Sequence, residues 1–254
     1  MKVITYNVNG IRAALNKGFA TWLKDENPDI ICLQETKAYK EQVDTAIFNY
    51  LGYEHHWFSA EKAGYSGVAI FSKLKPKHVE LGMGNPLYDR EGRVIRLDYD
   101  GFSVLSIYHP SGSSGEDRQD FKMGWLYFFL KYVNQLREEI PNLILCGDYN
   151  ICHKEIDIHD PKGNKDSSGF LPEERAWFDD FVAAGYVDTF RMMNPNPHHY
   201  TWWSYRANAR NNNKGWRIDY IMVTKGLESK VKESKILPDA KHSDHCPMYT
   251  VFDL

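Results

Sequence analysis

The 254-residue sequence predicts an α/β protein in which two mixed β-sheets pack face to face, with helices on the outside. Three observations lead to this fold class. Short apolar, β-branched runs outnumber the amphipathic segments, and the two kinds are interspersed along the chain. Each half contains an apolar strand followed by an acid and then a helix. No linker rich in Pro or Ser divides the sequence, so a single domain over residues 1–254 is expected.

The first 108 residues are expected to contain six strands and two helices. Strands are assigned to β-branched and aromatic runs, and helices to apolar residues that recur every three or four positions. Asp100-Gly101 is typical of a tight turn and predicts a hairpin between the last two strands. In chain order, the expected elements are a strand at 2–6, a helix around 19–26, a strand at 29–33, a helix at 43–51, and strands at 53–58, 67–72, 94–99 and 102–108.

The rest of the chain starts helical and ends in strands. Ser111 to Gly115 is expected to be a flexible loop, and apolar residues between 121 and 136 mark one face of the clearest helix. A buried strand at 143–146 follows, after which Gly147 is expected to let the chain turn. A polar loop at 153–170 precedes a second amphipathic helix, and the remaining expected elements are that helix at 173–184 and strands at 218–224 and 247–252.

Composition is that of an ordinary globular protein, with 43% hydrophobic and 26% charged residues. The net charge of −3 neither indicates nor excludes a nucleic-acid partner, because a local basic patch can be offset elsewhere. The four cysteines form no close CxxC pair, which favours reduced, buried thiols. Neither a signal peptide nor an apolar run of about 18 residues is present, so we expect a cytoplasmic protein without a membrane span, monomeric by default.

Polar side chains recur where the apolar strands end, and they are the candidate functional residues. A carboxylate such as Asp148, placed at the end of an apolar run, is costly to bury unless it is paired or used. Each residue taken alone is well explained as a turn or cap residue. Together they are harder to explain in that way: Asn7, Asn9, Glu35, Tyr108, Asp148, Asn150, Asp219, Asp244 and His245.

This set of side chains suits metal-assisted phosphodiester cleavage. Carboxylate and amide oxygens fit Mg²⁺ or Mn²⁺ better than zinc. Cleavage needs an activated water, stabilisation of the phosphoryl charge and help for the leaving oxygen. Glu35 with a metal, together with His245, Asn150, Tyr108 and Asp148, supplies those groups. Neither a GxSxG motif nor a phosphate-binding GxxxxGK[ST] loop is present.

The segment 198–217 has the composition of a nucleic-acid-binding loop. It contains four cations, among them Arg206 and Arg210, and no acid. Aromatic residues, including Trp202 and Trp216, are interleaved with these cations. The alternative is a solvated basic loop with buried tryptophans. Further candidates near the other motifs have equally ordinary alternatives, as surface charges or turn residues: Arg12, Lys17, Lys37 and Tyr65.

Five motifs resemble those of the exonuclease III family of apurinic/apyrimidinic endonucleases, in the endonuclease/exonuclease/phosphatase superfamily. They span the chain in the expected order: Asn7-Val8-Asn9-Gly10-Ile11-Arg12-Ala13, Leu33-Gln34-Glu35-Thr36-Lys37, Gly147-Asp148-Tyr149-Asn150, Trp216-Arg217-Ile218-Asp219-Tyr220 and Ser243-Asp244-His245-Cys246-Pro247. The stretches 157–170 and 200–216 resemble the DNA-repair branch in particular. The resemblance implies a four-layer α/β sandwich of the deoxyribonuclease-I-like type.

The resemblance also implies a role for each matching residue. Glu35 would hold the metal with help from Asn7, Asn9 or Asp244, and Asp148 would align or deprotonate the attacking water. His245, paired with Asp219, would contact the scissile phosphate, as would Asn150 and Tyr108. Trp202, Trp216 and Ile218 would form the pocket for a flipped abasic sugar, and further DNA contacts would come from Asn164, Lys165, Arg206 and Arg210.

Three positions depart from the best-known animal members of that family. Asn9 stands where those proteins have an aspartate, which bears on how the metal is held. The loop at 111–115 has small residues in place of an asparagine and a DNA-inserted arginine, and Ser167 replaces an asparagine. These departures bear on the grip on DNA more than on the chemistry.

The predicted function is Mg²⁺-dependent incision of double-stranded DNA 5′ to abasic sites, leaving a 3′-hydroxyl, with Mn²⁺ able to substitute. The resemblance further implies 3′→5′ exonuclease and 3′-phosphatase activity. Two alternatives stay open: a less selective nuclease or small-molecule phosphoesterase on the same scaffold, and a DNA-binding protein without turnover. One or two metals, and Asp148 or a metal-activated water as the general base, are equally open.

Overall fold

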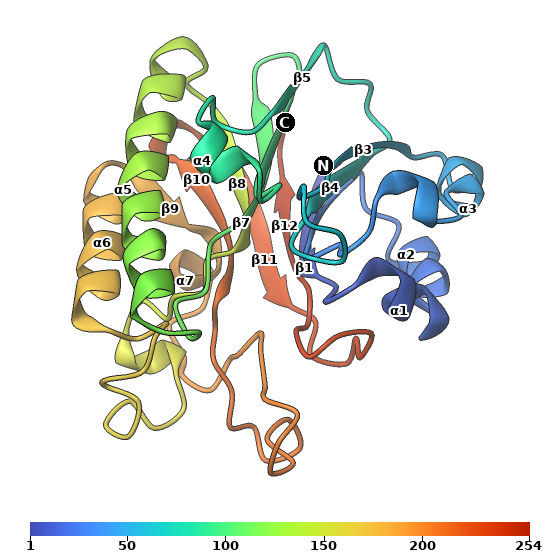
Figure 1. Cartoon of the computed structure of the whole chain (residues 1–254). Coiled ribbons are helices and arrows are strands. Elements are labelled where there is room, and N and C mark those ends of the chain that lie inside the picture. Colours follow the sequence, from blue (N-terminus) through green and yellow to red (C-terminus); the bar gives the residue numbers. More distant parts are fainter.

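The computed structural model describes residues 1–254 and arranges them in four layers, with two β-sheets in the middle (Figure 1). The first sheet has six strands, in the order β11 (Val231–Ile236), β12 (Met248–Phe252), β1 (Lys2–Asn7), β2 (Ile30–Gln34), β4 (Val68–Ser72) and β3 (Glu54–Phe58). The second also has six, in the order β5 (His78–Leu81), β6 (Val94–Asp98), β7 (Ser103–Tyr108), β8 (Leu143–Asp148), β10 (Asp219–Thr224) and β9 (Tyr186–Asp188).

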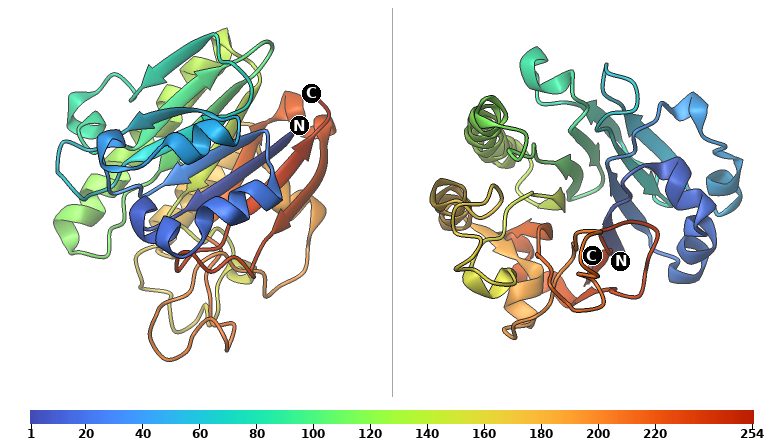
Figure 2. Two further views of the ribbon diagram at one scale, coloured as in Figure 1. Left: turned by 90° about the vertical axis from the view of Figure 1, so that its right-hand side faces the viewer. Right: turned by 60° about the horizontal axis from the view of Figure 1, so that its bottom comes forward.

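Helices cover the outer faces of both sheets, as the two further views also show (Figure 2). The first sheet is covered by α1 (Ile11–Asn16), α2 (Phe19–Glu26) and α3 (Ala46–Tyr50), and the second by α5 (Glu116–Glu139) and α6 (Pro172–Ala183). Shorter elements complete the chain: α4 (Pro86–Asp89), α7 (Thr189–Met193) and the 3₁₀ turns η1 (Lys40–Gln42), η2 (Glu155–Asp157) and η3 (Lys225–Lys230).

The central strands are buried on both faces, which explains their continuous apolar runs. In β8, Ile144 and Cys146 point into the core between the two sheets, while Leu143 and Leu145 point toward α5 and α6. In β1, Val3 packs between the sheets and Ile4 packs under the first-sheet helices. The predicted fold class, two packed mixed sheets flanked by helices, is confirmed.

Strand directions bring the predicted polar residues to one rim. β1 runs parallel to β2, and β7 runs parallel to β8, so the carboxyl ends of these four strands meet there. β10 is antiparallel to β8 and begins at this rim, with Asp219 opposite Asp148. Tyr108 is the register partner of Asp148 on the other side. The rim is therefore where the catalytic-type residues gather.

The thirteen expected strands and helices are all present, including the hairpin of β6 and β7 around Asp100-Gly101. Two details were wrong. The helix expected from residue 43 begins only at Ala46, because Val43 is extended. Gly147 does not turn the chain but lies within β8, where a Cβ would come within 2.0 Å of the Ile107 carbonyl oxygen. The glycine is thus required by the close approach of β7.

None of the helices has the length and apolar character needed to cross a membrane. The four cysteines are free and buried, as their spacing predicted.

Candidate active site

A cleft of about 460 Å³ opens at the rim where the strands end. It unites residues that are more than 200 positions apart in the sequence. Its lining includes nine of the residues predicted from the sequence together with four that were not: Glu35, Tyr108, Asp148, Asn150, Trp202, Trp216, Ile218, Asp244 and His245, then Ser111, Ser113, Ser168 and Gly169. The predicted residues Asn7, Asn9 and Asp219 adjoin this lining through hydrogen bonds.

Asp148 is the centre of the cleft's hydrogen-bond network. Its Oδ2 accepts a hydrogen bond of 2.9 Å from the Asn7 amide, which links the ends of the two sheets. Its Oδ1 accepts a 2.8 Å bond from the Asn150 backbone N–H. Burial, followed by the negative charge of Asp219, raises the pKa of Asp148 to about 7. A carboxylate with that pKa accepts a proton far more readily than an ordinary aspartate does.

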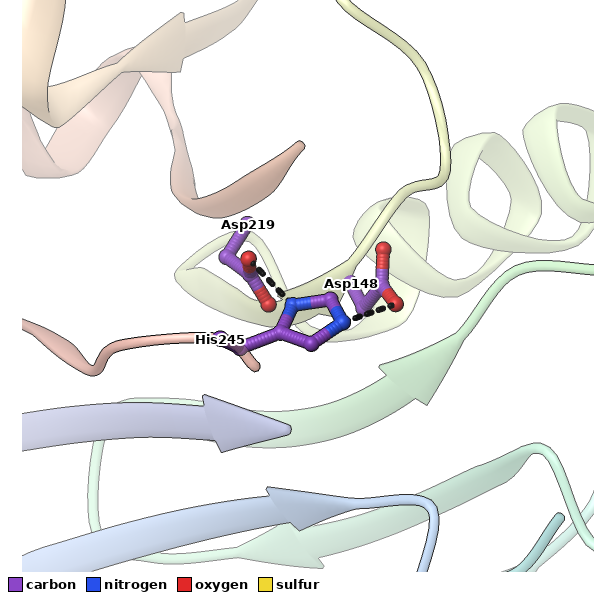
Figure 3. A group of neighbouring side chains, drawn as sticks. All are labelled: Asp148, Asp219 and His245. Atoms are coloured by element: carbon purple, nitrogen blue, oxygen red, sulfur yellow. Dashed lines mark hydrogen bonds and ion pairs between the residues drawn. The ribbon is translucent and has the colours of Figure 1, made fainter. Parts of the chain in front are cut away.

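His245 lies between two aspartates (Figure 3). Its Nδ1 is 2.9 Å from Asp219 Oδ2, and its Nε2 is 3.9 Å from Asp148 Oδ2. Burial alone lowers the pKa of the imidazolium, but the charge and hydrogen bond of Asp219, with Asp148 further on, outweigh burial and raise it to about 10. Asp219 thereby fixes the ring orientation and leaves Nε2 on the Asp148 side.

Tyr108 and Glu35 form a second pair in the cleft. The Tyr108 hydroxyl donates a 2.6 Å hydrogen bond to Glu35 Oε1, and burial raises the pKa of this phenol, with the Glu35 charge adding to the effect. Arg93, which the sequence reasoning missed, supports Tyr108 from behind. Its guanidinium donates to the Tyr108 carbonyl at 3.0 Å and lies 4.7 Å from the ring centroid. Tyr108 is therefore held by Arg93 on one side and by its hydrogen bond to Glu35 on the other.

The predicted metal ligands are connected in a single chain of contacts. Asn9 donates a 2.9 Å hydrogen bond to Asp244 Oδ1, and Lys37 Nζ contacts both Asn9 Oδ1 at 2.5 Å and Glu35 Oε1 at 3.6 Å. Asn7 Oδ1 accepts from the Asn9 backbone N–H. The two carboxylates and two amide oxygens along this chain of contacts offer only oxygen donors, so the chemistry of these residues fits a hard cation such as Mg²⁺.

A second group in the cleft is also able to hold a metal ion. The ligand atoms of Asp148, Asp219 and His245 lie within 4.8 Å of one another. Asp219 Oδ1 is buried and accepts no hydrogen bond from the protein. This group includes a ring nitrogen, whereas Mg²⁺ prefers oxygen ligands, so its chemistry is less suited to Mg²⁺ than the set around Glu35.

Backbone conformations are unusual just beyond the strand ends. Asn9, Glu35, Lys37 and Asn150 all have positive φ, between 45° and 51°, although none is a glycine. Left-handed backbone at such residues costs energy and persists only where the surroundings impose it. The Asn150 amide, for example, is held by a 2.9 Å hydrogen bond to the His109 carbonyl.

Aromatic and apolar side chains form one wall of the cleft. The rings of Trp202 and Trp216 meet edge to face at 5.9 Å, and both pack against a small cluster that contains Ile218. The Trp202 indole N–H donates to Asp244 Oδ2 at 3.0 Å. The three residues predicted to form a pocket therefore do lie together beside the acidic groups.

The predicted DNA contacts fall into two kinds. Arg12, Lys17, Lys165 and Arg206 are exposed and free to meet a phosphate backbone. Tyr65 is half-buried, and its hydroxyl accepts from Arg93 at 3.0 Å and from Arg118 at 3.2 Å.

Arg210 and Asn164, which are also predicted DNA contacts, make several hydrogen bonds within the protein. Arg210 donates to the carbonyls of Ser243, Pro238 and Ala240 at 3.0, 2.8 and 2.6 Å, and its guanidinium lies 4.7 Å from the Trp203 ring centroid. It thus holds the segment that precedes His245. Asn164 uses its amide to bond two carbonyls of its own loop. Their contacts with DNA stay predictions.

Sequence comparison finds that residues 4–245 match the endonuclease/exonuclease/phosphatase family. The chain is 44% identical to an exodeoxyribonuclease of Bacillus subtilis, with both chains fully covered. It is 41% identical to the DNA repair nuclease APEX1 of Danio rerio, covering 98% of this chain and 81% of that protein.

Solved structures agree with the sequence comparison. An AP endonuclease from Archaeoglobus fulgidus matches with a TM-score of 0.91 and 30% identity, and a 3′ phosphatase from Neisseria bound to product DNA hairpin matches with 0.92 and 28%. Both matches cover all of this chain and all of the other. The chain is therefore an enzyme of the endonuclease/exonuclease/phosphatase family, and it belongs to the exonuclease III branch that includes the exodeoxyribonucleases and the apurinic/apyrimidinic endonucleases.

Proposed function

We propose that this enzyme is a Mg²⁺-dependent DNA-repair nuclease that hydrolyses the phosphodiester bond 5′ to an abasic site and leaves a 3′-hydroxyl. One observation carries the proposal: a single cleft joins three kinds of group. It contains a buried Asp148–His245–Asp219 group, an all-oxygen ligand set around Glu35 and a wall of two tryptophans.

The acid–base group supplies the proton chemistry and the phosphate contacts. Asp148 Oδ2 lies 3.9 Å from His245 Nε2. A water between the phosphate and this carboxylate would be aligned and deprotonated by Asp148. His245 Nε2, the Asn150 amide and the Tyr108 hydroxyl would donate to the phosphoryl oxygens as negative charge builds on them. Asp219 would keep His245 in the orientation for that contact.

Mg²⁺, with Mn²⁺ as a substitute, would be held by Glu35 and Asp244 with help from Asn7 and Asn9. A bound metal polarises the phosphoryl group and offsets its charge. Lys37, 3.6 Å from Glu35, adds positive charge at the same side of the cleft.

Selectivity for damaged DNA would come from the tryptophan wall. An abasic nucleotide costs less to extrude than an intact one because it has no base to unstack. A pocket bounded by Trp202, Trp216 and Ile218 would accept the bare sugar and exclude nucleotides with a base. The exposed cations Arg12, Lys17, Lys165 and Arg206 would neutralise phosphates on either side.

A second activity is favoured by the similarity to the Neisseria 3′ phosphatase bound to a DNA hairpin. The same cleft would then remove 3′-phosphates or nucleotides from a DNA end, because the attacked phosphorus has the same surroundings in both reactions. We also propose a monomer acting in the cytoplasm, where reducing conditions suit four free thiols.

The test uses an end-labelled duplex with one abasic-site analogue beside an identical undamaged duplex, each with Mg²⁺ or with a chelator. The expected result is one Mg²⁺-dependent cut immediately 5′ to the lesion, which Asp148→Asn abolishes. Equal cutting of both duplexes would make the protein a less selective nuclease. Tight binding of the abasic duplex without any cut would make it a binding protein, and inactivity without binding would direct the search to small phosphoesters.

A further inference from the structure

A fully buried ion pair lies behind the cleft, outside the residues assigned so far. Lys122 on α5 and Glu174 on α6 both have no exposed side-chain surface, and Lys122 Nζ is 2.6 Å from Glu174 Oε1. Such a pair is weak evidence for stability, because removing two charges from water costs about as much as their attraction returns. Its other contacts indicate what it does.

Lys122 holds the backbone of the turn that carries Asn150. Its ammonium donates a 2.8 Å hydrogen bond to the Asn150 carbonyl. Asn150 has a φ of 50°. It donates its backbone N–H to Asp148, and its side-chain amide donates to the His109 carbonyl. The lysine therefore fixes the third polar group of a residue whose conformation is strained and whose side chain faces the cleft.

Glu174 holds the neighbouring segment around Gly169. Its Oε2 accepts from the backbone N–H groups of Gly169 at 2.6 Å and Leu171 at 3.0 Å. Gly169, with a φ of 97°, is in close contact with two parts of the cleft: a Cβ there would lie 2.9 Å from the Trp216 ring and 3.2 Å from the Asn150 carbonyl. The Glu174 carboxylate thus holds the Gly169 backbone in contact with the Trp216 ring.

We propose that Lys122 and Glu174 are positioning residues that set the spacing between the phosphate-contacting Asn150 turn and the Gly169–Trp216 wall of the sugar pocket. The inference deepens the proposed function and rests on it. The ion pair joins these two segments. Lys122 donates to the Asn150 turn, which is proposed to contact the phosphate, and Glu174 accepts from Gly169, which packs against Trp216. An abasic sugar seated against Trp216 then presents its 5′ phosphate at the correct distance from Asn150 and His245.

The sharpest test replaces both charges with groups of the same shape. Lys122→Met with Glu174→Gln leaves no unpaired charge in the core, so stability is expected to stay close to that of the wild type. The Asn150 carbonyl loses its donor, and Gly169 and Leu171 share a weaker acceptor. We expect kcat on abasic DNA to fall about 10- to 100-fold, which is typical of a small displacement of reacting groups. Affinity for abasic DNA in chelator should change little, and preference over undamaged DNA should fall.

The matched control is Trp177→Phe. Trp177 on α6 donates to the Leu126 carbonyl of α5 at 2.9 Å, so this change also removes a buried contact between the same two helices, but away from the cleft. It should lower the urea midpoint without changing kcat or lesion preference. If the double variant has the kcat and preference of this control, the pair is only structural and the proposal is wrong. Glu174→Gln alone, which is nearly isosteric, replaces the double variant if the latter does not fold.

Hydrogen exchange separates this inference from the proposed function. In the double variant, the amides of Gly169 and Leu171 should exchange faster than in the wild type, while those of β8 should not. If exchange is faster in the double variant but the wild type does not cut abasic DNA, the proposed function is overturned and the positioning role stands. Unchanged exchange would overturn the positioning role whatever the wild type cuts.

Discussion

The contacts of His245 make it the most sensitive single residue of the cleft. His245→Ala removes the ring that lies between Asp219 and Asp148. We expect cleavage to fall by about 10²- to 10⁴-fold, because one positioned proton donor or acceptor contributes on that order. DNA affinity measured in chelator should persist. His78→Ala on the exposed edge strand β5 is the control, and near-normal turnover of His245→Ala would remove this residue from the mechanism.

Trp202 has two contacts that a pair of variants separates. Trp202→Ala removes both the wall against Trp216 and the hydrogen bond to Asp244, whereas Trp202→Phe keeps an aromatic wall and loses only the bond. We expect Trp202→Ala to lower the preference for abasic over intact DNA by about 10-fold, the scale of one base-sized stacking contact. Trp202→Phe should keep most of that preference. Equal preference in both variants and the wild type would reject the wall.

His109 predicts how stability depends on pH. Both ring nitrogens are buried without a hydrogen-bond partner, the ring stacks on Tyr149 at 4.2 Å, and burial, with the charges of Lys122 and Arg93, holds its pKa well below the usual range. The unfolded chain therefore binds more protons below pH 6.5, and the free energy of unfolding falls as pH drops, by at most about 1.4 kcal/mol per pH unit for this residue.

His109→Phe should remove that contribution. The measurement is urea unfolding of both proteins at pH 7 and pH 5, and the variant should lose less stability between the two. The other histidines with lowered pKa, such as His153 and His242, are common to both proteins and cancel in the comparison. An equal loss in both proteins would show that His109 is not the group responsible.

At the level of single residues, the sequence identified the cleft well and its supports poorly. Asp148 and Glu35 were recognisable because an acid that follows an apolar run is unusual. Lys122 and Glu174 were not, because a charge in an amphipathic helix is normally assigned to the solvent face. The internal contacts of Arg210 were missed for a related reason: composition shows a cation, but only the fold shows that it donates to three carbonyls.

Among the elements, β8 depends on a residue that was first read as a turn. Gly147→Ala would place a methyl group 2.0 Å from the Ile107 carbonyl oxygen, in the ladder that joins β7 to β8. The strands would have to separate beside Tyr108 and Asp148. We expect a loss of about 2–3 kcal/mol, typical of overpacking, together with reduced kcat. The urea midpoint and single-turnover rate measure the two effects, and a variant with wild-type values in both would show that the strands yield freely.

The elements that the sequence did not predict are short or lie at an edge. β11 is half charged and buries only Val231 and Ser234, and as the edge of its sheet it needs little apolar surface. α1 and α7 have six and five residues, which is too short for a helical period to be visible. α4 did carry a signal: Asn85 caps it, and Pro86 follows as the first helical residue.

For the whole molecule, the packing of the two sheets predicts a single unfolding transition. β1, β2 and β4 share one core with β6, β7, β8 and β10, so neither sheet can bury its inner face alone. Trp22 and Trp57 report on the side of the first sheet, and Trp125 and Trp177 on the side of the second. Fluorescence and far-UV circular dichroism should therefore give coincident urea transitions. Two separated transitions would contradict the predicted single domain over residues 1–254.

Because β1 pairs with β12, the first sheet cannot be completed until late in the synthesis of this sequence. Of the strands described here, β1 is synthesised before all the others and β12 after them, yet the two are neighbours in one sheet, and His245 lies just before β12. Until β12 is synthesised, β1 lacks one of its two neighbouring strands and the cleft lacks the imidazole of His245. A translation product that stops before residue 245 lacks this imidazole, so we expect it not to cleave DNA.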